Sequence, residues 1–181
     1  MSARLDRKTR LLHWSIAAVI LGLIAFGLYM TWTEAFPLYH LHKSIGLLVF
    51  LAIVPRAVWR LKSGLPQPVR PFSKVEHWGA TLVHWSLLAC TVAMPLTGML
   101  YSAASGHGFG IFALDLFPTH HDPANPALET PFDGRLADLG QAAHHWIGWT
   151  LLGLTGLHVA GALKHHFIDR DRTLVRMLGL P

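Results

Sequence analysis

Four long apolar stretches constrain the fold of this chain more than any other feature of its sequence. They lie at residues 11–32, 41–61, 78–104 and 139–163, and each can cross roughly 30 Å of hydrocarbon at about 1.5 Å per residue. The second stretch carries Lys43, Arg56 and Arg60 near its ends, where long basic side chains can reach the interface. Only 14% of all residues are charged, against roughly 25% in an average soluble domain. The sequence therefore predicts an all-α, integral membrane four-helix bundle, with residues 1–181 forming a single membrane domain.

Basic residues are distributed unequally between the two sides of this bundle. Of the 15 Lys and Arg residues, only Lys43 and Arg135 fall on the side of the first and third connections. Because cytoplasmic segments are enriched in Lys and Arg, both termini are predicted to be cytoplasmic. The connection at 105–138 is then periplasmic, and we expect it to cap the bundle, with 109–117 at the membrane surface. The net charge of +5 thus orients the chain among membrane lipids and does not indicate nucleic acid binding.

Six of the 13 histidines fall inside the predicted spans, where an ionisable side chain needs a partner. His145 is interpreted as making a hydrogen bond at the end of the bundle, and the other five are candidates for a functional site. They are His13, His42, His84, His144 and His158. The spacing of His144 and His158 is roughly 40° short of four helical turns, so both rings project from nearly one face, about 21 Å apart. At matching depths, we expect His13 beside His158 on the cytoplasmic side and His42 beside His144 on the periplasmic side.

Two histidine pairs inside a four-helix bundle are what two b haems require, since each porphyrin leaves two axial positions on its iron. The single Cys90 excludes a CxxC or CxxCH cofactor motif. Gly46 and Gly148 each follow a histidine of the periplasmic pair by four residues, which indicates room for haem or ordinary close packing of helices. His84 lies at the depth of the cytoplasmic pair. It is interpreted as hydrogen-bonded to a neighbouring helix, as an alternative ligand, or as a contact of a haem propionate or a quinone.

A spaced set of residues along the four spans carries a family resemblance. Leu12-His13-Trp14 opens the first span, His42 with Gly46 and Arg56 marks the second, His84 with Pro95 and Gly98 the third, and His144 with Gly156-Leu157-His158 the fourth. With the tail from Lys164 to Met177, this set resembles the bacterial cytochrome b561 family. That family comprises four-helix di-haem b proteins related to the cytochrome b subunits of hydrogenases and formate dehydrogenases.

The resemblance implies a multi-pass protein of the bacterial cytoplasmic (inner) membrane. It implies two b haems, with His13 and His158 as axial ligands of one haem iron and His42 and His144 as ligands of the other. It further implies electron exchange with the ubiquinone pool. Similarity to the stand-alone member from enteric bacteria implies oxidation of superoxide at the periplasmic face, coupled to quinone reduction.

Several questions about partners stay open at this point. Lys43 and Arg135 are candidates for steering an anionic donor such as superoxide, or else they contact lipid headgroups and the acidic loop. The electron donor is a small molecule or a protein. One alternative function is a haem b membrane-anchor subunit that carries electrons for a partner dehydrogenase or hydrogenase. A histidine-based metal transporter fits less well, because the histidines form two layers and the spans contain no carboxylate.

Overall fold

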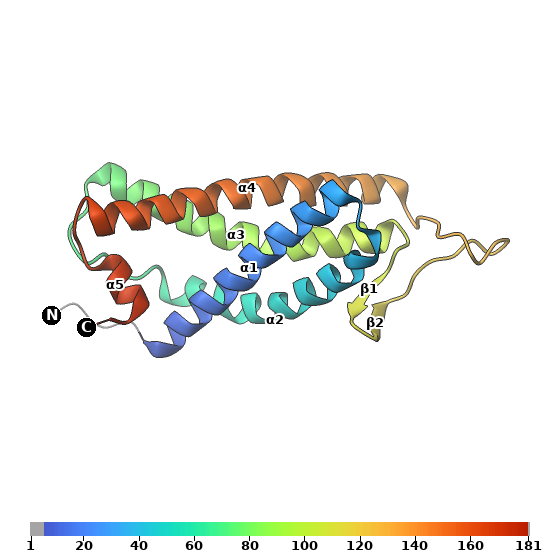
Figure 1. Ribbon diagram of the computed structural model, residues 1–181, viewed down its shortest axis with the longest axis horizontal. Helices are drawn as coiled ribbons and strands as arrows, with labels where there is room; N and C mark the ends of the chain where they lie inside the picture. The colour runs from blue at the N-terminus through green and yellow to red at the C-terminus, as the bar shows by residue number, and fades with distance from the viewer. Residues whose placement is uncertain (1–5, 181) are drawn as a thin grey trace.

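The computed structural model describes residues 6–180 and contains four long helices that lie side by side (Figure 1). α1 spans Arg7–Thr33, α2 Tyr39–Ser63, α3 Lys74–Ala104 and α4 Gly134–Phe167. Each is long and apolar enough to cross a membrane, which confirms the all-α, four-helix membrane bundle. Arg4, one of the basic residues that set the predicted orientation, lies outside the described residues.

The helices extend past the apolar stretches from which they were predicted, because local capping interactions fix where they begin. Ser73 caps α3: its hydroxyl accepts from the backbone N–H of Glu76, whose carboxylate accepts from the N–H of Ser73. The carboxylate of Asp133 accepts from the backbone N–H groups of Arg135 and Leu136, so α4 begins at Gly134 and not at residue 139.

The bundle consists of two helix pairs. α3 and α4 pack along each other, α1 packs against α2, and α2 joins the pairs through α3. α1 and α4 approach each other closely at few points along the described chain. Few hydrophobic side chains among the described residues are buried: Ile16, Met30, Leu47, Ile53, Ala57, Ala104, Ala137 and Leu151. Protein side chains therefore fill the space between the two pairs only thinly.

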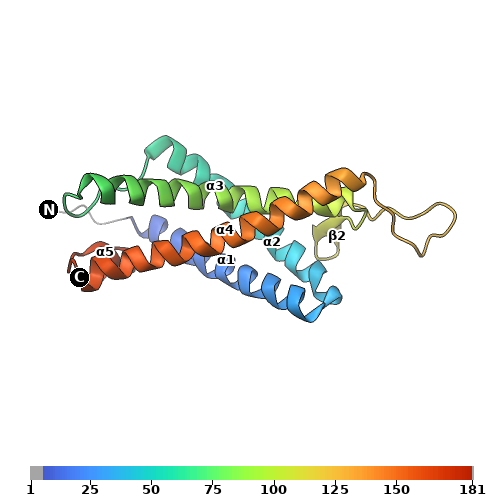
Figure 2. The same cartoon turned by 90° about the horizontal axis from the view of Figure 1, so that it is seen from above.

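The connection between α3 and α4 forms one end of the molecule, which we call the loop end. Strands β1 (Phe109–Ile111) and β2 (Leu114–Phe117) make an antiparallel hairpin that packs against α2. The rest of the connection, residues 118–133, extends away from the helices as an arm (Figure 2). The predicted cap is therefore only partly correct. The hairpin lies against the bundle, but the proline-rich arm does not cover it.

Both ends of the described chain lie at the opposite end of the bundle, which we call the terminal end (Figure 1). After α4, the short helix α5 (Thr173–Leu178) folds back against the other helices. The indole N–H of Trp14 donates to the carbonyl oxygen of Met177, and the guanidinium of Arg176 donates to that of Gln67. These contacts tie the C-terminal segment to α1 and to the connection between α2 and α3.

Candidate functional site

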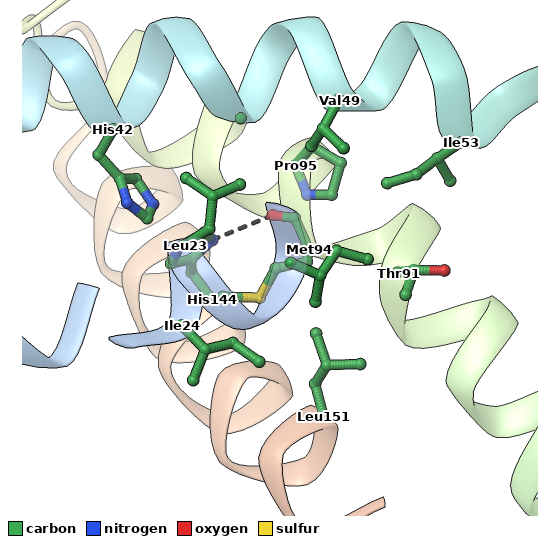
Figure 3. A pocket seen from close by; sticks show the side chains of 12 residues that line it. Leu23, Ile24, His42, Val49, Ile53, Thr91, Met94, Pro95, His144 and Leu151 are labelled. Carbon is green, nitrogen blue, oxygen red and sulfur yellow. Dashed lines mark hydrogen bonds between the residues drawn. The ribbon is translucent and has the colours of Figure 1, made fainter. Parts of the chain in front are cut away.

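At the loop end, His42 of α2 and His144 of α4 face each other, with ring centroids 6.3 Å apart and planes at 81°. Nδ1 of His144 donates to the carbonyl oxygen of Met94 at 3.0 Å (Figure 3). The hydroxyl of Thr97 lies 3.3 Å from the same nitrogen. Because a carbonyl oxygen only accepts, the neutral ring carries its proton on Nδ1. Its Nε2 therefore keeps a free lone pair.

A mainly apolar cavity of about 80 Å³ lies beside this pair. All four long helices contribute to its lining, which includes both histidines and the predicted Gly46 (Figure 3). This volume accommodates only part of a porphyrin, so a bound haem must also use the thinly filled space between the helix pairs.

Glycines give the two rings of the loop end their space, but not all are the predicted ones. A Cβ atom added at Gly98 would lie 3.1 Å from Cε1 and 3.2 Å from Nδ1 of His144, and one at Gly27 would lie 3.5 Å from His42. At Gly46 an added Cβ would meet no atom within 4 Å, whereas at Gly148 it would approach the side chain of Met94 at 3.3 Å. Gly27 and Gly98 lie on helices other than those of the rings they contact. Spacing from a histidine within one helix therefore could not reveal them.

At the terminal end, His13 of α1 and His158 of α4 form a second pair, with ring centroids 6.2 Å apart. The structure thus brings together the histidines that were paired from their depths in the sequence. His84 of α3 joins them, with its ring centroid 5.0 Å from that of His158 and its Nδ1 donating to the carbonyl oxygen of Ala80. The guanidinium of Arg56 donates to Nδ1 of His13 at 3.0 Å. The neutral His13 ring therefore carries its proton on Nε2, the reverse of His144, and must give up this hydrogen bond to offer Nε2 to a metal.

The two pairs fit the axial ligation of a haem iron. An iron shared by two imidazoles needs about 2 Å to each nitrogen, the usual length of a metal–imidazole bond, and each nitrogen lies about 1 Å from its ring centroid. Facing rings must therefore have centroids about 6 Å apart, and both pairs meet this requirement. Nδ1 of His42 is buried without a hydrogen-bond partner among residues 6–180, so the two histidine rings of the loop end are held unequally.

The two predicted steering cations differ in their surroundings at the loop end. The ammonium of Lys43 is half-buried and donates to the carbonyl oxygens of Gly108 at 2.9 Å and His107 at 3.4 Å. Arg135 lies exposed in the first turn of α4. Lys43 therefore holds the hairpin in place, whereas Arg135 is accessible to a solute.

A further cluster of possible metal ligands occurs at the terminal end. Ligand atoms of His165, Asp169 and Asp171 lie within 4.8 Å of one another. Arg70 contacts Asp169 at 2.7 Å and Asp171 at 3.4 Å, and Lys164 contacts Asp169 at 2.8 Å. Because these cations already neutralise the carboxylates, the cluster is an ion-pair network and not a second metal centre.

Comparison with known proteins places the whole chain in a family. The sequence profile described as prokaryotic cytochrome b561 matches residues 4–180, which is nearly the whole chain. The chain belongs to the prokaryotic cytochrome b561 family. Membership identifies it as a multi-pass membrane protein that binds haem b and transfers electrons.

Individual relatives support the same assignment. The chain is 36% identical over 173 residues to "Cytochrome b561 homolog 2" of Escherichia coli strain K12, covering 92% of this chain and 87% of the relative. It is 28% identical over 138 residues to "Probable superoxide oxidase CybB" of Yersinia pestis, covering 76% of this chain and 73% of the relative. It is 27% identical over 139 residues to "Cytochrome b561 homolog 1" of E. coli strain K12, covering 76% of this chain and 72% of the relative.

Proposed function

We propose that this b561-family protein holds two b haems and moves electrons between a donor at the loop end and the ubiquinone pool. The observation that carries the proposal is the presence of two facing histidine pairs, one at each end of the bundle, with nearly equal ring separations. His42 and His144 are the proposed axial ligands at the loop end, and His13 and His158 those at the terminal end. The loop end is periplasmic in this proposal, and the membrane is the bacterial inner membrane.

The residues around the rings determine what the site can do. The carbonyl of Met94 holds the proton of His144 on Nδ1 and so leaves Nε2 free to bind a metal. Haem b, when bound, supplies an iron that takes up and releases one electron. With two histidines holding each iron, the chain would leave no open coordination site, and a substrate would exchange electrons without binding to the metal. The chain's own part is to hold the rings, exclude water and set the potentials through hydrogen bonds and nearby charges.

Superoxide is the proposed donor, coupled to reduction of ubiquinone. The similarity to the Yersinia pestis protein named a probable superoxide oxidase supports this choice. Exposed Arg135 is suited to attract the anion, and Lys43 adds positive charge at the same end of the bundle. Arg135→Ala is expected to lower the rate of superoxide-driven haem reduction and to weaken its salt dependence. If the rates of Arg135→Ala and Lys43→Ala matched wild type at every salt concentration, steering by these residues would be wrong.

The main experiment is a reduced-minus-oxidised visible spectrum with haem quantitation on the purified protein. Two low-spin b haems per chain are expected, with one lost in each of the single variants His42→Ala and His13→Ala. The same preparation should reduce a ubiquinone analogue when superoxide is supplied. A protein that bound zinc in place of haem would overturn the proposal.

His84 is the proposed contact of a haem propionate or of the quinone headgroup, because its ring lies against that of His158. His84→Leu is expected to keep both haems but to lower the rate of quinone reduction. Loss of haem from His84→Leu, with retention in His13→Ala, would instead make His84 an axial ligand.

A second candidate function rests on the arm at residues 118–133, which extends from the bundle and offers a surface to another protein (Figure 2). In that case the chain is a haem b anchor subunit that carries electrons for a peripheral dehydrogenase or hydrogenase. Mild-detergent purification distinguishes the two functions. A 20.1 kDa chain that reduces quinone alone supports the first, and a stoichiometric partner supports the second.

A further inference from the structure

The hairpin at the loop end exposes a group of apolar side chains that the proposed electron transfer does not use. Phe112 in the turn is 49% exposed, and Leu114 and Leu116 of β2 are 61% and 53% exposed. We call these three residues the hairpin tip. Clustered apolar side chains on an otherwise polar connection indicate a surface that contacts something other than water.

Hydrogen bonds from the helices fix the position of the hairpin tip along the bundle. The backbone N–H of Phe112 donates to the hydroxyl of Ser44 at 2.8 Å, and Ser44 is fully buried. The carbonyl oxygen of Gly108 accepts from Lys43 at 2.9 Å and from Ser102 at 2.6 Å. Side chains from both α2 and α3 therefore hold β1, and the backbone of Phe112 lies at the level of Ser44.

That level lies inside the predicted membrane boundary. Ser44 follows the start of α2 at Tyr39 by five residues, which corresponds to about 7.5 Å along the helix axis. A hydrocarbon layer of roughly 30 Å takes up about 20 residues of α2, or about 41–61 when it is centred on the helix. The hydroxyl that binds the hairpin tip thus lies a few residues below the boundary.

The hairpin tip also lies on the outside of the bundle. Figure 1 shows the hairpin beside the start of α2, on the side away from α4. Exposed aromatic side chains surround this end at a shallower level, with Trp32 and Phe36 73% and 69% exposed. Aromatic residues at such positions are typical of the headgroup region. The hairpin tip is therefore continuous with a membrane-facing surface.

We propose that Phe112, Leu114 and Leu116 insert into the lipid leaflet at the loop end, at the boundary between headgroups and acyl chains. The partner is lipid, and not a second protein or the arm. An interfacial depth is required because the outer edges of a two-stranded hairpin carry backbone groups that need water or headgroup oxygens. Insertion would hold the hairpin against Ser44, which follows His42 by two residues in α2.

Cysteine labelling in lipid nanodiscs that hold one chain each tests this proposal. Phe112→Cys is compared with the exposed arm variant Asn125→Cys and the span variant Leu51→Cys, all in a Cys90→Ala background. Each is treated with a charged, water-soluble maleimide and with an apolar maleimide that partitions into lipid. Phe112→Cys should react at least about tenfold more slowly than Asn125→Cys with the charged reagent, because lipid disfavours the reactive thiolate. With the apolar reagent it should react like Leu51→Cys.

Each other result contradicts insertion. Rapid reaction of Phe112→Cys with the charged maleimide would place the hairpin tip in water. Slow reaction with both reagents, below the level of Leu51→Cys, would mean that protein covers it. Haem spectra of the labelled variants show that each chain is correctly assembled.

Discussion

The position of the His144 ring depends on two residues of α3, because the carbonyl oxygen of Met94 accepts its proton and Gly98 leaves it space. Substitution of Gly98 tests this dependence most directly. An added Cβ would lie 3.1 Å from the imidazole, so the ring must move away from the carbonyl of Met94. Weakening that hydrogen bond by about 1 kcal/mol in one redox state corresponds to about 40 mV for a one-electron couple. Gly98→Ala is therefore expected to shift the midpoint potential of one haem by tens of millivolts and to leave the other unchanged, as measured by redox titration.

Gly153→Ala is the matched control for this substitution. Gly153 also lies inside a spanning helix, but an added Cβ would meet no atom within 4 Å. The haem midpoint potentials of the Gly153→Ala variant should equal those of wild type. Equal shifts in Gly98→Ala and Gly153→Ala would show that the effect is a general one of glycine replacement and that the contact with His144 has no special role.

Arg56 places a positive charge beside the other histidine pair. Its guanidinium lies 3.0 Å from Nδ1 of His13, and oxidation of a haem adds one further positive charge nearby. Charges about 8 Å apart at an effective dielectric constant near 20 repel by about 2 kcal/mol, or on the order of 80 mV. Arg56→Gln is thus expected to lower the midpoint potential of the terminal-end haem by tens of millivolts. A potential that stayed constant or rose would contradict this role.

How much of this site is predictable differs between residues. Helical periodicity and depth were enough to pair His13 with His158 and His42 with His144, since both properties follow from position along one helix. The contacts of Gly98, Gly27 and the Met94 carbonyl depend on how neighbouring helices are rotated. A single sequence contains no direct signal for that rotation.

An ion-pair network joins α3 to α4 at the terminal end of the bundle. Its members are Arg70, Glu76, Lys164, Asp169 and Asp171. The hydrogen bond from Lys164 is the main reason that the pKa of Asp169 lies below its ordinary value, and Arg70 adds to the effect. A lowered folded pKa means that the stabilisation is complete above the unfolded pKa of about 3.9 and is lost as the pH falls through the folded value.

The expected result is a melting temperature that falls on acidification below about pH 4 in wild type and falls less in Arg70→Ala. Melting in detergent micelles between pH 7 and pH 3 measures this difference. Lys62→Ala, which removes an exposed cation at the end of α2, should follow the wild-type curve. Parallel curves for Arg70→Ala and wild type would show that the network does not stabilise the fold.

The hairpin is the element that sequence patterning missed. Its register shifts between Phe109 and Gly110, so neither strand gives a clean alternation of apolar and polar residues. Its position depends on Ser44 and Ser102, two small polar residues inside apolar helices that periodicity treats as neutral. Helix existence was predictable because a bilayer leaves few alternatives for a long uncharged stretch. No comparable constraint acts on the connection.

At the scale of the whole molecule, both ends of the described chain lie at one end of the bundle, and nearly all cations of the sequence belong to segments at that end (Figure 1). The positive-inside tendency then predicts that this end faces the cytoplasm. Green fluorescent protein fused to the C-terminus should fluoresce, because it folds in the cytoplasm, and a C-terminal alkaline phosphatase fusion should be inactive. The opposite pair of results would invert the bundle and place the hairpin on the cytoplasmic side.

The thin interior of the bundle makes stability depend on what lies between the helix pairs. Only a few hydrophobic side chains are buried, and α1 scarcely meets α4 in the described chain. A ligand present at about 1,000 times its dissociation constant stabilises the folded state by about 4 kcal/mol. Protein produced without haem is therefore expected to keep its helical circular dichroism, because the bilayer enforces backbone hydrogen bonding, but to melt at a lower temperature.

Hydrogen exchange in the haem-free protein should increase first in α1, which has few other contacts. In the variant His42→Ala this increase should occur only at the loop end. A haem-free chain that melted like the loaded protein would mean that helix packing alone holds the bundle together.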